Sequence, residues 1–141
     1  MNSESEPAQV VDAILGGSVA PKALDLLARM IEDGDAAQLL SVLVSRCRAS
    51  SKSEEEAVSQ SMLKLEQLAR SSRPLACMMM VHLLPIASGL MMHDVFDAIG
   101  LWISDCKSEK LTEYLKLMAR SSDDPDMKRH YEWLFQARAH D

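Results

Sequence analysis

The sequence predicts an all-α fold: a single compact domain of about seven or eight helices, arranged as a helical bundle or as a short superhelix of two-helix repeats. Aromatic residues make up only 4% of the 141 residues, whereas leucine, alanine, methionine and glutamate, which favour helices, are plentiful. Apolar residues recur at helical spacing, and no segment alternates with the period of two that is typical of a strand. Glycine, proline and polar clusters separate the helical segments.

The domain is predicted to cover residues 7–138. Residues 1–6 and 139–141 are expected to be short tails, the first of them disordered. Residues 1–7 are polar and acidic and lack the basic and apolar regions of a secretory signal, so we expect no signal peptide.

The first two helices are defined by glycine and proline. The first is expected over residues 7–15 and ends at Gly16 and Gly17. The second opens at Pro21, because the missing N–H of proline costs nothing in a first turn. It ends at Gly34, where the chain turns.

The third and fourth helices show the strongest local signals. Asp35 is expected to cap the third helix, and Ser53 with Glu56 forms a capping box at the start of the fourth. The third helix keeps a regular amphipathic spacing over six apolar positions, which are Ala36, Leu39, Leu40, Leu43, Val44 and Cys47.

Residues 75–86 are apolar on nearly every side, which is typical of a helix buried all round. We therefore expect this fifth helix at the centre of the fold. Pro85 should kink or end it, and Gly89 should allow a tight turn into a sixth helix that starts near His93. The seventh helix is expected after a cap at Ser108, and the last opens at Asp124 and Pro125.

A weak internal echo is compatible with two-helix repeats of the HEAT, armadillo or TPR type. Residues 65–72 align with residues 115–122, and residues 27–29 are a fainter third copy. The shifts between copies are irregular, which favours coincidence over a structural repeat.

The charge balance argues against nucleic-acid binding. With 15 basic and 21 acidic residues, the net charge is −6, and no basic block is present. Three short basic spots are expected to be solvated helix faces: Arg46 with Arg48, Arg70 with Arg73, and Lys128 with Arg129.

Cysteine usage and hydropathy favour a cytoplasmic protein. Cys47, Cys77 and Cys106 form no Cys-x-x-Cys pair and are expected to be small buried hydrophobes. Pro74 to His93 contains no charged residue and is long enough to span a bilayer, but prolines, histidines and a glycine interrupt it. We expect a buried helix and a turn there, with membrane association as the weaker alternative.

No catalytic constellation stands out, so we expect no enzyme, no cofactor and no metal. The alternative hypothesis is a small metal-dependent hydrolase centred on His93, Asp94 and Asp97, where an imidazole and two carboxylates lie close in sequence. A cap on the sixth helix by His93 or Asp94 is the simpler interpretation.

The unusual feature is the number of methionines, ten in all. Met78, Met79 and Met80 are consecutive and sweep about 200° of a helix, so they cannot share one face. Met91 and Met92 are adjacent as well. The excess indicates either a loosely packed core or a flexible binding groove.

The leading hypothesis is a non-catalytic protein–protein interaction module, such as an adaptor, a chaperone, a toxin-neutralising protein or a regulatory protein. It would bind a protein or peptide, rather than nucleic acid or a membrane, through an apolar, methionine-rich groove. One of Met91 and Met92 should tuck under the next helix while the other stays available. The predicted partner-binding residues are Met79, Leu90, Met91, Met92 and His93.

Overall fold

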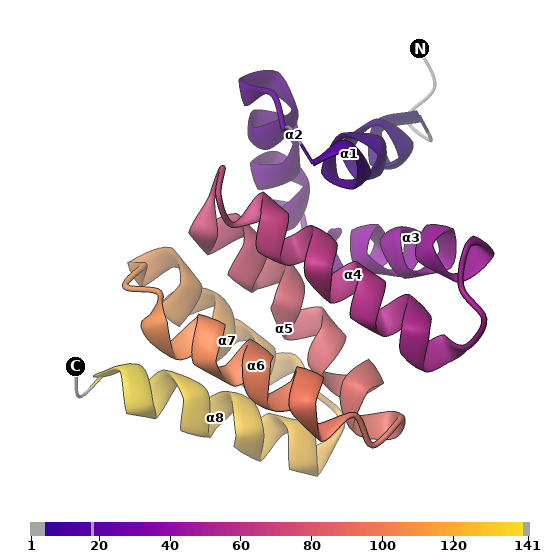
Figure 1. The fold of residues 1–141 in the computed structure, drawn as a ribbon. Helices are drawn as coiled ribbons and strands as arrows, with labels where there is room; N and C mark the ends of the chain where they lie inside the picture. Colours follow the sequence, from indigo (N-terminus) through magenta and orange to yellow (C-terminus); the bar gives the residue numbers. More distant parts are fainter. Residues whose placement is uncertain (1–4, 18, 140–141) are drawn as a thin grey trace.

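Every regular element in the described part of the chain, residues 5–17 and 19–139, is a helix in this computed structural model (Figure 1). Eight helices occur in those residues and pack into one compact domain, as a bundle or a helical repeat would. They are α1 (Ser5–Gly16), α2 (Pro21–Glu32), α3 (Ala36–Ala49), α4 (Glu54–Leu68), α5 (Arg73–Gly89), α6 (His93–Asp105), α7 (Glu109–Ser121) and α8 (Pro125–Ala139). The all-α prediction is confirmed.

The helices from α3 onward form two rows. α3 packs on α5, and α5 on α7, while α4 and α6 pack on α5 from the other side and α6 packs on α8. In Figure 1, α4, α6 and α8 lie on the near side of the molecule. α1 contacts α2, α3 and α4, and α2 reaches α5. α5 therefore touches five other helices.

The ends of the chain differ slightly from the predicted tails. α1 begins at Ser5 and α8 extends to Ala139, so helix covers residues 5, 6 and 139. The remaining tail positions, 1–4 and 140–141, lie outside the described residues.

α5 is buried over most of its surface, as its apolar composition predicts. Its fully enclosed side chains come from every face of the helix, because neighbours cover it from several directions. They are Ala76, Cys77, Met79, Met80, Val81, Leu83, Leu84 and Ala87, and Met78 keeps only 6% of its surface exposed.

Three helices have the side-chain N-caps that the sequence predicts. The Oγ atoms of Ser53 and Ser108 accept hydrogen bonds from backbone N–H groups in the first turns of α4 and α7, and Asp124 does the same for α8. The capping box at α4 is modified, because the Glu56 carboxylate accepts from the N–H of Lys52. Each of these bonds satisfies a donor that the helix itself leaves unpaired.

Two predicted caps are wrong. Asp35 occupies the N-cap position of α3, but its side chain makes no capping hydrogen bond. Neither His93 nor Asp94 caps α6, because both lie inside the helix and Met92 holds the N-cap position without a side-chain bond.

Pro85 does not end α5. The helix continues for four residues beyond it, to Gly89. Pro85 is exposed, so its ring lies on the solvent side of the helix. The cost is the hydrogen bond that an N–H at this position would donate to the carbonyl of Val81.

The turn between α5 and α6 is made by Met91 and not by Gly89. Met91 has a φ of 58°, in the left-handed region, while Gly89 is the last residue of α5. The N–H of Met91 donates to the carbonyl of Ser88 at 3.0 Å, and the N–H of Met92 donates to that of Ala87 at 2.9 Å. This is the Schellman pattern, which usually places glycine at the left-handed position.

The two stronger copies of the internal echo lie in non-equivalent helices. Residues 65–72 end α4, and residues 115–122 end α7, three helices further along the chain. A two-helix repeat would relate helices that are an even number of places apart. This pair of copies therefore does not fit a two-helix repeat, whereas the fainter copy at residues 27–29 lies in α2, two helices before α4.

The uncharged segment from Pro74 to His93 forms most of α5 and the turn after it. Within the described residues, no helix combines the length and the apolar character that crossing a membrane requires.

Candidate functional site

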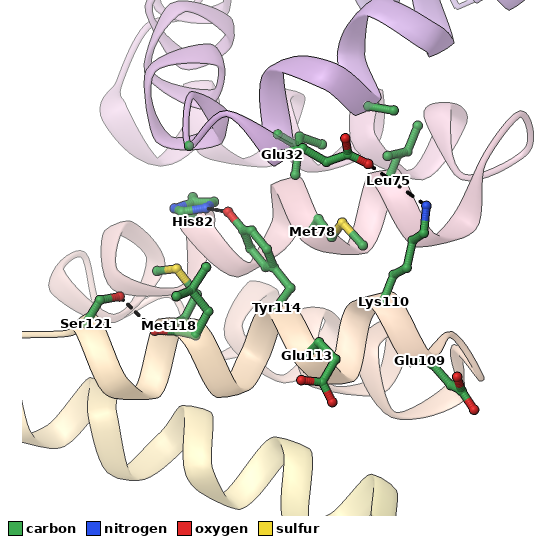
Figure 2. Close-up of a pocket in the computed structure, with 14 residues that line it drawn as sticks. Glu32, Leu75, Met78, His82, Glu109, Lys110, Glu113, Tyr114, Met118 and Ser121 are labelled. Atoms are coloured by element: carbon green, nitrogen blue, oxygen red, sulfur yellow. Dashed lines mark hydrogen bonds and ion pairs between the residues drawn. The ribbon is translucent and has the colours of Figure 1, made fainter.

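A groove of about 710 Å³ opens between α2, α5 and α7 (Figure 2). α5 forms the floor, and α2 and α7 form the two walls. Both walls pack on α5 but make little contact with each other, so the space between them stays open. The volume is within the range of ligand-binding clefts.

α7 lines the groove with a second apolar face. Its buried face consists of Leu111, Leu115 and Ala119. Tyr114, Leu117 and Met118 project between these positions and line the groove instead. Leu117 keeps 51% of its surface exposed, although it is one of the largest apolar residues on the helix. Tyr114 and Met118 also pack against the core, so Leu117 is the part of this wall that the described helices leave most exposed.

The floor and the second wall are also mainly apolar. Leu75 and Met78 line the groove from α5, together with His82. Ala28 and Ile31 line it from α2. The apolar spacing on α2 and α5 is three to four residues, so each helix turns one stripe toward the groove.

One polar pair lies in the floor. Figure 2 shows Tyr114 pointing from α7 toward His82 on α5, where the hydroxyl and Nε2 are hydrogen-bonded. The two rings meet edge to face, with centroids 5.7 Å apart. Burial lowers the pKa of His82 to about 4 and raises the pKa of Tyr114 to about 12. Both groups are therefore neutral at pH 7, and the floor carries no formal charge.

The rim of the groove carries charges of both signs. Lys110 on α7 reaches across the mouth to Glu32 on α2, with 4.0 Å between Nζ and Oε1 (Figure 2). Glu109 and Glu113 extend from α7 away from α2. Glu113 also pairs with Lys116, one turn further along α7, at 3.3 Å. These exposed pairs contribute little stability, so a partner could exchange them at small cost.

The predicted partner-binding residues lie elsewhere, at the α5–α6 turn. Met91, Met92 and His93 line a smaller cavity of about 340 Å³, with Ser59 of α4 opposite them. Met91 is 74% exposed and Met92 is half-buried against the core, so the two methionines divide as the sequence predicts. Leu90 is half-buried and packs on the core.

The prediction that Met79 binds a partner is wrong. Met79 lies on α5, has no exposed surface and belongs to the core. Its neighbours Met78 and Met80 are buried too. The sequence left open whether the methionines of this helix belong to the core or to a binding groove. Five other helices pack on α5, and they leave Met79 and Met80 with no exposed surface, while Met78 keeps 6% of its surface at the floor of the groove.

His93, Asp94 and Asp97 do not form a metal site in this structure. All three are exposed on the first turns of α6. Across the described residues, no three histidine, cysteine, aspartate or glutamate side chains come together in a group that could hold a metal ion.

Sequence reasoning missed the groove between α2, α5 and α7. The available signal was the excess of apolar residues on α7, where Tyr114 and Leu117 fall outside the main buried stripe. A second apolar stripe on an otherwise polar helix indicates a second contact. Only the structure shows that this contact is unfilled.

Comparison of the chain with protein-family models, curated proteins and solved structures finds no match.

Proposed function

We propose that this protein is a non-catalytic interaction module whose groove between α2, α5 and α7 holds the apolar face of an amphipathic helix from a partner protein. The observation that supports this most strongly is the pair of apolar walls, on α2 and α7, that face each other across α5 without a helix between them. Helix-in-groove binding uses such a surface, with anchors at spacings of three and four residues.

The length of the α7 wall matches a short helix. Its α7 wall extends from Glu109 to Ser121, which corresponds to about 18 Å at 1.5 Å per residue. A partner helix of about three turns matches that length. Its apolar residues would pack on Leu75, Met78 and Leu117, and a polar atom on the same face would meet the His82–Tyr114 pair.

The rim favours a partner helix with polar flanks. Among the charged residues that line the groove, three are glutamates and one is Lys110. A basic side chain on the partner can therefore pair with Glu109, or take the place of Lys110 beside Glu32. Adaptors, chaperones, toxin-neutralising proteins and regulatory subunits all use contacts of this kind, and the three buried cysteines favour a reducing compartment such as the cytoplasm.

We also propose a smaller contact with the same partner at Met91, Met92 and His93. Its support is the exposed Met91 side chain at the edge of the 340 Å³ cavity. Apolar side chains beside polar ones are the usual composition of an interface patch.

Photo-crosslinking from the groove tests the proposal. A photoreactive amino acid replaces Leu117, and in a control variant it replaces Leu101, which is 66% exposed on α6 and does not line the groove. Each purified variant is irradiated in native extract, and crosslinked peptides are sequenced. We expect position 117 alone to join an amphipathic helical segment of one protein, through its apolar face. Equal crosslinking from both positions, or a small molecule as the sole adduct at 117, would contradict the proposal.

A further inference from the structure

The three basic spots of the sequence differ in whether carboxylates of the chain form ion pairs with their arginines. At two of the three spots the arginines are neutralised by carboxylates of this chain, through the pairs Arg46–Asp12, Arg48–Glu54 and Arg129–Asp126. Arg70 and Arg73 are the third spot, and among the described residues they have no ion-pair partner. Both side chains are exposed.

Arg70 and Arg73 instead line a cavity of about 450 Å³. It opens where α4 ends and α5 begins, with Trp102 of α6 on its other side. α4 and α6 each pack on α5 but make little contact with each other, which leaves this space uncovered. The guanidinium of Arg73 lies over the Trp102 ring, 4.8 Å from its centroid, so a cation–π contact holds it at the cavity.

The cavity joins positive charge to apolar surface. Leu63 of α4 lines it and is 59% exposed, and Trp102 is half-buried. Glu66 is the one carboxylate in the lining, and it forms no ion pair with either arginine in the described structure. Two guanidinium groups against one carboxylate leave a local charge of +1 in a chain whose net charge is −6.

This cavity is separate from the groove between α2, α5 and α7. At 100° per residue, Arg73 lies roughly 140–200° around α5 from Leu75, Met78 and His82, which face the groove. A ligand can therefore occupy one site without entering the other.

We propose that this cavity binds an acidic segment of a partner protein in which a carboxylate side chain lies beside an apolar one. The carboxylate accepts charge-assisted hydrogen bonds from the guanidinium N–H groups of Arg70 and Arg73. The neighbouring apolar side chain packs on Leu63 and Trp102. A polyanion such as single-stranded nucleic acid fits less well, because two arginines cannot offset its repulsion by an acidic protein.

Tryptophan fluorescence provides a direct readout. The chain has two tryptophans, so Trp133→Phe leaves Trp102 as the only reporter. The probes are short peptides with two glutamates beside leucine, phenylalanine or methionine, and matched peptides with glutamine in place of glutamate. Inorganic phosphate and a short oligothymidylate are the other two probes. The double variant Arg70→Ala/Arg73→Ala is compared with Arg46→Ala/Arg48→Ala, which removes the same charge at a spot that is already neutralised. Circular dichroism checks that both variants keep their helices.

We expect at least one acidic peptide to change Trp102 emission with a Kd below about 1 mM and the glutamine peptides to bind at least about tenfold more weakly. The Arg70→Ala/Arg73→Ala change should weaken binding by about tenfold or more, and Arg46→Ala/Arg48→Ala by less than about twofold. The proposal is overturned if no acidic peptide binds at about 1 mM, or if both double variants lose binding equally. It is also overturned if phosphate or oligothymidylate binds more tightly than the acidic peptides, because the site then recognises a different anion.

Discussion

At the level of single residues, Met91 holds a backbone conformation that a side chain rarely adopts. Because its side chain is largely exposed, little burial offsets the strain of the left-handed conformation. We predict that Met91→Gly stabilises the fold by about 0.5–1 kcal/mol, which is the relief of left-handed strain less the entropy that glycine loses on folding. Urea unfolding measures the change.

Gly34→Ala is the reverse experiment, because it places a side chain at a left-handed position that glycine now occupies. Gly34 has a φ of 90° at the end of α2, and no atom would clash with an added Cβ, so backbone strain alone should destabilise the variant. A Met91→Gly variant that is less stable than the wild type would contradict this description of the turn. If Met91→Gly is more stable but binds the partner more weakly, Met91 is retained for contact and not for folding.

His82 makes the stability of the fold depend on pH. Burial lowers its pKa from 6.5 to about 4, so between these values the unfolded chain binds a proton that the folded chain does not. Stability should therefore be constant with respect to this group above about pH 7 and fall as the pH drops from 6.5 toward 4. The loss attributable to His82 should be at most about 3 kcal/mol.

Urea unfolding at pH 7 and at pH 4.5 isolates this contribution. His82→Gln should lose less stability between the two pH values than the wild type does, and His93→Gln, at an exposed position, should lose as much as the wild type. Some loss should persist in His82→Gln, because burial also lowers the pKa of His130. Equal losses in all three proteins would show that protonation of His82 is not coupled to unfolding.

At the level of elements, Pro85 is the clearest local conflict between sequence and helix. α5 continues through it without the hydrogen bond to the carbonyl of Val81. Since the ring is exposed, its removal should leave no cavity. We predict that Pro85→Ala stabilises the protein by about 1–3 kcal/mol in urea unfolding.

Pro21→Ala provides the comparison. Pro21 is also exposed, but it opens α2, where its missing N–H has no helical partner to lose. This variant should be unchanged or slightly less stable, because the fixed φ of proline suits a first turn. If both variants gain the same stability, the gain does not come from the hydrogen bond in α5.

The element scale also shows what local patterns predict well. The six apolar positions of α3 are all buried, and Ser53, Ser108 and Asp124 cap the helices that follow them. Periodicity and capping depend on residues within one or two turns, so the sequence specifies them directly. The end of α5 was misplaced because Met91 adopts a conformation that the sequence would assign to Gly89.

At the level of the whole molecule, the features that could not be predicted depend on which helices become neighbours. The burial of Met78, Met79 and Met80 follows from the enclosure of α5 by five other helices. The groove exists because α2 and α7, about 80 residues apart in the chain, flank α5 without closing on each other. Helix periodicity gives the apolar face of each element but not the element that covers it.

The same limit applies to the two candidate contacts outside the groove. The sequence identified Met91, Met92 and His93 as a group because they are adjacent. It treated Arg70 and Arg73 like the other basic spots, because ion pairs such as Arg46–Asp12 join residues from different helices. Which arginines are left without an ion-pair partner in the described structure therefore depends on the tertiary structure.

The most direct test of the central claim, that the groove holds a partner helix, is the affinity of the crosslinked partner segment for groove variants. The segment is synthesised as a peptide and titrated by calorimetry against the wild type, Leu117→Glu and Leu101→Glu. Both substitutions place a carboxylate at an exposed leucine, so each should change stability by no more than about 0.5 kcal/mol. We predict that Leu117→Glu weakens binding by more than about 1 kcal/mol while Leu101→Glu leaves it unchanged. Equal affinity of the peptide for Leu117→Glu and the wild type would contradict the claim.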